Sequence, residues 1–372
     1  MKSSEKQLIV GRRNALKMMG LGSALMLSSG FNDILAGEPA DMKFPEKPFN
    51  NDGMSPVAFT TGTDRMQMIF EVIKPFHSEL KTGIKNKTVV IKPNMVVTNN
   101  PLCATHKDAI KAVLEYLKPI YKGQVIIAES SSSVDSASGF EAYGYTELEK
   151  DYNVKFIDLN ARKNGKPYFV LDRDLHLDKI EIADIFSNPD YYVISLSRLK
   201  THNSVVMTGG TKNIAMAAPL NPGTAVDGGR PISYKRNMHS GGNRWLHYNI
   251  YLMAQSVRPD FTIIDGVEGM EGNGPISGTA VDHRIAMAGF DVIAVDSMCA
   301  RLMGIPLEQV GYLNYCAAAG IGYTDRDKIE IIGNQDPDKS IIKYQMNQNI
   351  ERQLEWMEPF DQGTQGQQRS RG

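Results

Sequence analysis

Cysteine is scarce in this chain, and its scarcity excludes two classes of protein. Three cysteines occur among 372 residues, Cys103, Cys299 and Cys316, and none forms a close pair with another. An odd set without close pairs encodes neither a disulfide framework nor a cysteine metal cluster. We expect Cys299 to be buried in an apolar helix, and Cys103, which follows a loop proline, is the one candidate for exposure.

The chain also lacks an excess of one charge and a long apolar segment. Lys plus Arg number 41 and Asp plus Glu number 42, so no overall field would attract nucleic acid or an anionic membrane. No stretch approaches the roughly 20 apolar residues that a membrane-spanning helix needs. We therefore expect no nucleic-acid partner and no membrane span in the mature protein.

The N-terminus has the pattern of a twin-arginine export peptide. Arg12 and Arg13 are followed by an apolar stretch over residues 18–27 and by small residues around Ala36. That stretch is too short to cross about 30 Å of hydrocarbon, which disfavours a membrane anchor. We predict a signal peptide over residues 1–36, recognition by the twin-arginine export machinery, and a periplasmic or otherwise extracytoplasmic location.

Composition divides the rest of the chain into three parts. Residues 37–55 are polar and proline-rich and predict a linker. Residues 361–372 consist mainly of Gln, Gly, Ser and Arg and predict a disordered tail. Between them we expect a single α/β domain over residues 56–360, without internal repeats.

Apolar strands and amphipathic helices alternate along this domain, which indicates βαβ units. Thr63 and Asp64 can cap the first helix, and residues 208–242 are rich in glycine without clear periodicity. We predict an α/β fold with a mostly parallel or mixed sheet, helices on both faces, and one loop-like glycine-rich insertion that partly covers the site. The expected strands span residues 88–92, 124–128, 154–158, 191–196, 261–264, 284–288 and 328–332, and the later helices span 106–121, 141–151, 244–257, 292–303 and 306–319.

Polar side chains follow five of the expected strands. In a parallel α/β sheet, ligands bind beyond the carboxyl ends of the strands, where loops separate and helix N-termini point inward. Each polar group alone is commonly a solvated loop, but their joint occurrence predicts one shared site. The groups are Lys92 to Asn94, Glu129 with Ser130 to Ser133, Arg198 to His202, Asp265 with Glu268 and Glu271, and Asp291 to Asp296.

Both signs of charge occur among these groups, so we predict an anion bound beside a cation. Carboxylate and amide oxygens favour Mg²⁺, Ca²⁺ or Mn²⁺, while histidines would favour a transition metal, and no diagnostic metal motif is present. The predicted anion ligands are Lys92, Asn94, Ser130, Ser131, Lys212 and Asn213, and the predicted divalent-cation ligands are Glu129, Asp265, Glu268, Glu271 and His239.

His202 and Lys200 are the predicted catalytic residues. An imidazole beside a lysine is easily shifted across neutral pH, which suits His202 to general acid–base work, although a capping role is the plain alternative. We expect Lys200 to be an exposed strand-end lysine, whose removal would weaken anion binding with little loss of stability.

Two glycine-rich segments differ from known phosphate-binding loops. The segment from Gly269 to Pro275 runs into a proline instead of opening a helix, which argues against nicotinamide binding. The segment from Thr208 to Asn213 lacks the spacing of a nucleotide P-loop. Its backbone N–H groups could still bind an anion.

Several of these motifs, in this order, resemble the bacterial and archaeal family called domain of unknown function 362. The resemblance covers roughly residues 89–304. Members often look like exported or iron–sulfur-associated proteins, some with an added ferredoxin module, but this chain lacks the cysteines for such a cluster. The motifs are Lys92-Pro93-Asn94, Leu199-Lys200-Thr201-His202, Thr211-Lys212-Asn213, Asp265-Gly266, Glu271 to Pro275, Gly278, and Asp291 to Asp296.

Three functions remain open from the sequence. The first is a metal-assisted enzyme that acts on a small phosphate- or carboxylate-bearing substrate, with His202 moving the proton. The second is a non-catalytic protein that binds an anion or a metal ion with the same residues. The third is a redox or racemase-type enzyme that holds an organic or nickel cofactor near Lys200 and His202.

Overall fold

The computed structural model describes residues 53–359 apart from residues 133–134, 162–164, 222–225, 228–229 and 232. The predicted signal peptide, most of the predicted linker and the predicted C-terminal tail lie outside the described residues, as does Ser133. Among the described residues, no helix is long and apolar enough to cross a membrane.

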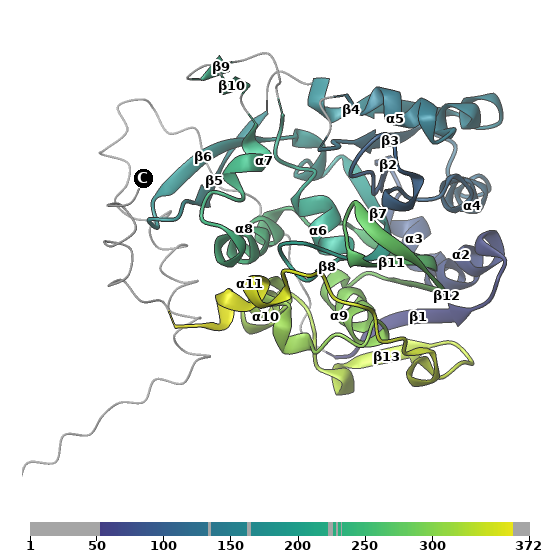
Figure 1. Ribbon diagram of the computed structural model, residues 1–372. Helices are drawn as coiled ribbons and strands as arrows, with labels where there is room; N and C mark the ends of the chain where they lie inside the picture. Colours follow the sequence, from purple (N-terminus) through teal and green to yellow (C-terminus); the bar gives the residue numbers. More distant parts are fainter. Residues whose placement is uncertain are drawn as a thin grey trace, which may run out of the picture.

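The centre of the structure is a nine-stranded sheet with the order β13-β1-β12-β11-β7-β2-β3-β4, and β8 pairs with β7 (Figure 1). Five neighbouring strands, β4, β3, β2, β7 and β11, are mutually parallel, and β12 runs antiparallel to both β11 and β1. The predicted α/β class and mostly parallel sheet are therefore confirmed. The strands are β1 (Ser55–Thr61), β2 (Thr88–Pro93), β3 (Val125–Glu129), β4 (Val154–Asp158), β7 (Tyr191–Thr201), β8 (Met207–Thr208), β11 (Phe261–Asn273), β12 (Ser277–Gly289) and β13 (Ile329–Ile332).

Helices cover both faces of this sheet (Figure 1). Side chains along a strand alternate between the faces. On β2, Val90 belongs to the core beneath α6, α8, α9 and α10, while Val89 and Ile91 belong to the core beneath α2, α3 and α4. The helices are α2 (Arg65–Ile73), α3 (His77–Gly83), α4 (Lys107–Leu117), α5 (Ala137–Ala142), α6 (Gly210–Ala215), α7 (Tyr234–Asn237), α8 (Asn243–Ser256), α9 (Val292–Leu302), α10 (Gly311–Ala318) and α11 (Ile350–Gln353).

The structure contains strands that the sequence pattern did not predict. β1 lies where the linker was expected to give way to the domain, and it occupies an interior position between β12 and β13. β5 (Lys166–Leu171) and β6 (Leu177–Ile182) form a separate antiparallel hairpin. The short pair β9 (Val226–Asp227) and β10 (Arg230–Pro231) forms a further two-stranded sheet.

The largest difference concerns the hairpin of β11 and β12. We expected short strands over residues 261–264 and 284–288, with a polar loop between them. Both strands instead have 13 residues, and their pairing continues to Asn273 and Ser277. Asp265, Glu268 and Glu271 therefore lie along a strand, and β11 projects past the point where β2 and β3 end.

Two further expectations need correction. Cys103 is fully buried, so it is not an exposed thiol. The glycine-rich insertion is not loop throughout, because it contains α6, whose buried Ile214 and Ala215 pack into the core.

Candidate functional site

Lys92, the last charged residue of β2, is buried at the carboxyl edge of the sheet. Its Nζ atom lies 2.7 Å from Oε1 of Glu129 at the end of the neighbouring β3. It also donates to the Pro93 carbonyl at 2.5 Å and to Oδ1 of Asn213 on α6 at 3.0 Å. The second carboxylate oxygen of Glu129 is buried and has no hydrogen-bond partner among the described residues.

Two asparagines connect this ion pair to Lys200. Asn213 accepts from Nδ2 of Asn94 at 3.0 Å and donates to the Lys92 carbonyl at 3.1 Å. Lys200 on β7 donates to Oδ1 of Asn94 and, at 2.9 Å, to the Cys103 carbonyl. Lys200 is 0% exposed, so the expectation of an exposed strand-end lysine was wrong.

Two more lysines face the same region. Lys212 lies on α6 and is partly buried, and Lys235 on α7 is buried with its ammonium group 2.7 Å from the Met216 carbonyl. The charges of Lys92 and Lys212 act on Lys235, and that of Lys212 acts on Lys200. We call Lys92, Lys200, Lys212 and Lys235 the lysine cluster.

Burial makes the charged form of these lysines costly. Burial, followed by the positive charge of neighbouring residues, lowers the pKa of Lys200, Lys212 and Lys235 to about 7 each. Burial also lowers the pKa of Lys92, although Glu129 opposes that shift. At neutral pH these lysines are therefore only partly protonated, and a bound anion would increase the number of protons that they hold.

The two predicted histidines border the lysine cluster. His202 is 5% exposed, and burial followed by the charge of Lys212 lowers its pKa well below the usual value. Its Nδ1 atom accepts from the backbone N–H of Ser204 at 3.0 Å, which leaves Nε2 as the donor of a neutral ring. His239 is exposed, and desolvation followed by Lys212 lowers its pKa.

The serines after β3 hold the loop around Glu129. The N–H of Ser130 donates to Oε1 of Glu129 at 2.7 Å, and its hydroxyl donates to Asn160 at 2.9 Å. The N–H of Ser131 donates to the Ser136 hydroxyl at 3.0 Å. Both serines are buried, and these bonds orient the carboxylate that pairs with Lys92.

The other predicted cation ligands have partners of their own. Asp265 lies 3.0 Å from Nε of Arg65, and Glu268 lies 2.7 Å from the buried guanidinium of Arg198. Glu271 accepts from the backbone N–H of Gln345 at 2.8 Å. No three His, Cys, Asp or Glu side chains of the described part of the chain gather as a metal-binding group.

A buried carboxylate positions α6 in this site. Asp296 accepts from the N–H groups of Gly210 at 2.6 Å and Thr211 at 2.9 Å, and burial raises its pKa to about 6. A Cβ atom on Gly209 would come within 2.3 Å of this carboxylate, so the chain needs glycine there. Asp296 thereby fixes the helix that carries Lys212 and Asn213.

The sequence analysis predicted no functional role for Lys235 or Arg198. Lys235 lies in the glycine-rich insertion, where periodicity gave no element to place it. Arg198 was noted at a strand end, but its bonds to the carbonyls of Pro101 at 3.1 Å and Ala104 at 3.0 Å connect segments far apart in sequence.

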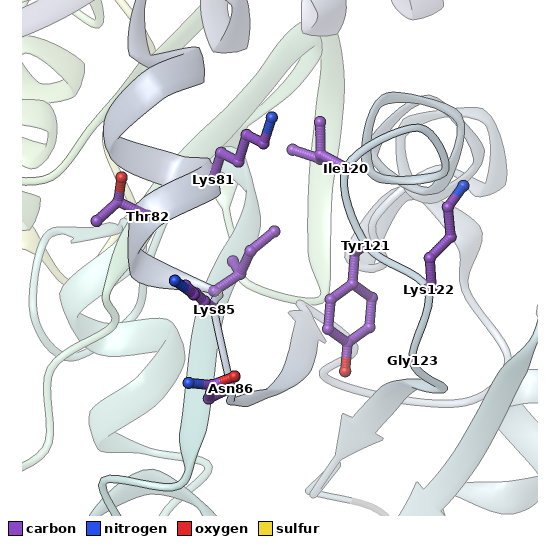
Figure 2. Close-up of a pocket in the computed structure, with 9 residues that line it drawn as sticks. Lys81, Thr82, Lys85, Asn86, Ile120, Tyr121, Lys122 and Gly123 are labelled. Carbon is purple, nitrogen blue, oxygen red and sulfur yellow. The ribbon is translucent and has the colours of Figure 1, made fainter.

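An open pocket of about 570 Å³ lies at the opposite, amino-terminal edge of the sheet (Figure 2). Lys81, Lys85 and Lys122 line it together with Tyr121, all placed before the starts of β2 and β3. All three lysines are exposed, so this pocket lacks the buried partners that distinguish the lysine cluster.

The fold and the lysine cluster define an α/β protein with a buried cationic site at the carboxyl edge of a largely parallel sheet. The model of the family described as "Domain of unknown function (DUF362)" matches residues 89–301, more than half of the chain, so the chain belongs to this family. The match contains most of the site, from Lys92 to Asp296.

One relative and one solved structure show how far the similarity extends. The chain is 24% identical over 217 residues to "Thylakoid-associated protein sll1697" of Synechocystis sp.. The aligned residues make up 58% of this chain and 62% of that protein. A crystal structure of a Thermotoga maritima protein covers 70% of this chain and 60% of its own chain at 10% identity, with a TM-score of 0.37.

Proposed function

We propose that this protein binds a small phosphate- or carboxylate-bearing molecule at the lysine cluster. The supporting observation is the excess of positive charge: the charges of Lys92 and Lys212 act on other members of the lysine cluster, whereas among the described residues Glu129 is the carboxylate that forms an ion pair with the cluster, through Lys92. Surplus positive charge in a buried site is unfavourable, and an anionic ligand offsets it.

The polar neighbours support a small ligand instead of an extended polyanion. Asn213 accepts from the ammonium group of Lys92 at 3.0 Å, Asn94 accepts from that of Lys200, and Asn213 is itself held by donating to the Ser195 hydroxyl at 3.0 Å. Such preorganised side chains lower the entropic cost of binding. The neutral His202 would add a hydrogen-bond donor to the ligand.

Titration calorimetry of the full chain with inorganic phosphate, and separately with acetate and malonate, tests this proposal. We expect saturable binding and a higher melting temperature in the presence of ligand. Lys235→Met should weaken binding by roughly 10- to 100-fold, the effect of losing one charged hydrogen bond of about 1.5–3 kcal/mol.

The matched control is Lys85→Met, which removes a lysine of the opposite pocket and should leave the dissociation constant unchanged. Equal weakening by both variants would indicate a general charge effect. No binding of any of the three anions by the wild-type protein would overturn the proposal.

The divalent cation, the metal-assisted reaction and the redox or racemase-type alternative stay predictions. Glu129 would hold a cation through its second carboxylate oxygen, which is buried and has no hydrogen-bond partner among the described residues, while its first oxygen pairs with Lys92. Elemental analysis of the purified protein tests this: a stoichiometric metal that disappears in Glu129→Gln would support a metal site beside the anion.

Export by the twin-arginine route is likewise our proposal for location. It is supported by Arg12, Arg13 and the apolar stretch that follows them. A fusion of residues 1–36 to a folded reporter should be exported, and Arg12→Lys with Arg13→Lys should retain it in the cytoplasm. Equal export of both fusions would contradict the proposal.

A further inference from the structure

Lys212 differs from the other members of the lysine cluster in its hydrogen bonding. Lys92 donates to the Pro93 carbonyl, Lys200 to the Cys103 carbonyl and Lys235 to the Met216 carbonyl. Lys212 has neither a hydrogen-bond acceptor nor a carboxylate partner within the described part of the chain. Among the residues that the structure describes, its amine is therefore not committed to a structural bond.

Lys212 is also the member that a ligand can approach. The side chains of Lys92 and Lys200 are 2% and 0% exposed, whereas Lys212 is only partly buried. Its helix is fixed in place by the two N–H bonds to Asp296. A small anion held by the deeper lysines would present its remaining atoms to Lys212.

The surroundings of Lys212 favour an amine with a free lone pair. Lys92, Lys200, Lys235, His202 and His239 all interact with its charge, and none of them is a carboxylate. Nearby cations and loss of hydration both disfavour the ammonium form, which is how lysines become nucleophiles near neutral pH.

We propose that Lys212 forms an imine with the aldehyde or keto carbonyl of a small molecule whose carboxylate or phosphate is bound by the deeper lysines. This rests on the proposed function and names its ligand class. The amine nitrogen bonds to the carbonyl carbon, the carbon–oxygen bond breaks, and the oxygen leaves as water with the two amine protons. No oxidant or reductant takes part.

Reductive trapping tests this inference on the full chain. The protein is mixed with glyoxylate and borohydride, which converts an imine to a stable secondary amine, and the modified lysine is located by peptide mapping with mass spectrometry. We expect the adduct on Lys212. Acetaldehyde has the carbonyl but no anionic group, so its yield of adduct on Lys212 should be lower by at least about 10-fold.

Three comparisons make the result decisive. Inorganic phosphate should protect Lys212 from glyoxylate. Lys212→Arg should lose the adduct although it keeps a positive charge, and Lys85→Arg should leave the adduct unchanged. Peptide mapping of the wild-type protein gives the answer even where a variant folds poorly.

The inference and the proposed function fail differently. Phosphate binding without an adduct on Lys212, or with adducts spread equally over exposed lysines such as Lys85, would overturn the inference and leave anion binding standing. Absence of both phosphate binding and a Lys212 adduct would overturn both.

Discussion

Two groups of cations at the sheet's carboxyl edge differ in their carboxylate partners. Arg65 pairs with Asp265 and Arg198 with Glu268, which we call the arginine pairs. In the lysine cluster, Lys92 pairs with Glu129, and the ion pairs of the described residues include none for Lys200, Lys212 or Lys235. Matched charges stabilise the fold, whereas unmatched buried charges indicate a place for a ligand.

The largest expected effect concerns the arginine pairs. Arg198→Met should lower the free energy of unfolding by about 3 kcal/mol or more, because it removes the donor to the buried Ala104 carbonyl and the cation that pairs with Glu268. Chemical denaturation measures this loss. Phosphate binding by the folded fraction should persist, and its disappearance would show that the arginine pairs belong to the ligand site.

The pH dependence of binding sharpens the comparison for the lysine cluster. Lys200, Lys212 and Lys235 have pKa values of about 7, and an anion favours their protonated forms. Phosphate binding at pH 8 should therefore take up protons, and affinity should fall by up to about tenfold per pH unit per proton between pH 7 and 9. Calorimetry in buffers of different ionisation enthalpy measures the uptake, and zero uptake would contradict protonation on binding.

Without ligand, the same three lysines make the stability of the fold rise with pH, which is opposite to the trend in affinity. Lysines ionise near pH 10.5 when unfolded and near pH 7 here, so the unfolded chain binds more protons between these values. Their contribution to folding is unfavourable below pH 7 and diminishes as pH rises toward 10.5. Melting temperatures of Lys235→Met and the wild-type protein should thus converge as pH rises, and parallel curves would contradict this.

A smaller effect is expected at the helix that carries Lys212. Asp296→Ala removes the acceptor of two backbone N–H groups and should cost about 1–2 kcal/mol of stability. It should also weaken phosphate binding, because α6 loses its anchor. Unchanged binding, measured by calorimetry on the folded variant, would show that α6 holds its position without Asp296.

The smallest effect belongs to the pocket at the other edge. Lys122 is exposed there, so Lys122→Met should change stability by less than about 0.5 kcal/mol and leave phosphate affinity unchanged. Denaturation and calorimetry on one preparation check both. A loss of phosphate binding would move the ligand site to the pocket of Figure 2.

The sequence predicted the fold class because strand and helix alternate with clear apolar periodicity. It did not predict β1, which follows a proline-rich stretch and is defined by its neighbours β12 and β13. The strand predicted for β11 was also too short, because a segment rich in glycine and carboxylates has weak strand propensity. Its pairing with β12 up to Asn273 overrides that propensity.

The polar residues at strand ends were found from sequence, but their partners were not. Lys92, Asn94 and Asn213 do come together with Glu129. Arg65, which pairs with Asp265, begins a helix 200 residues earlier, and no local pattern connects them. The burial of Lys200 was likewise missed, since strand-end position alone does not say whether a loop covers the side chain.

The position of β1 has a consequence for how the molecule assembles. Ala58 pairs with Ala288, and Ser55 pairs with Ile329, so one of the earliest strands lies between two of the latest. During synthesis that strand has no bonding edge available until nearly all of the sheet has left the ribosome. Such long-range pairing slows folding.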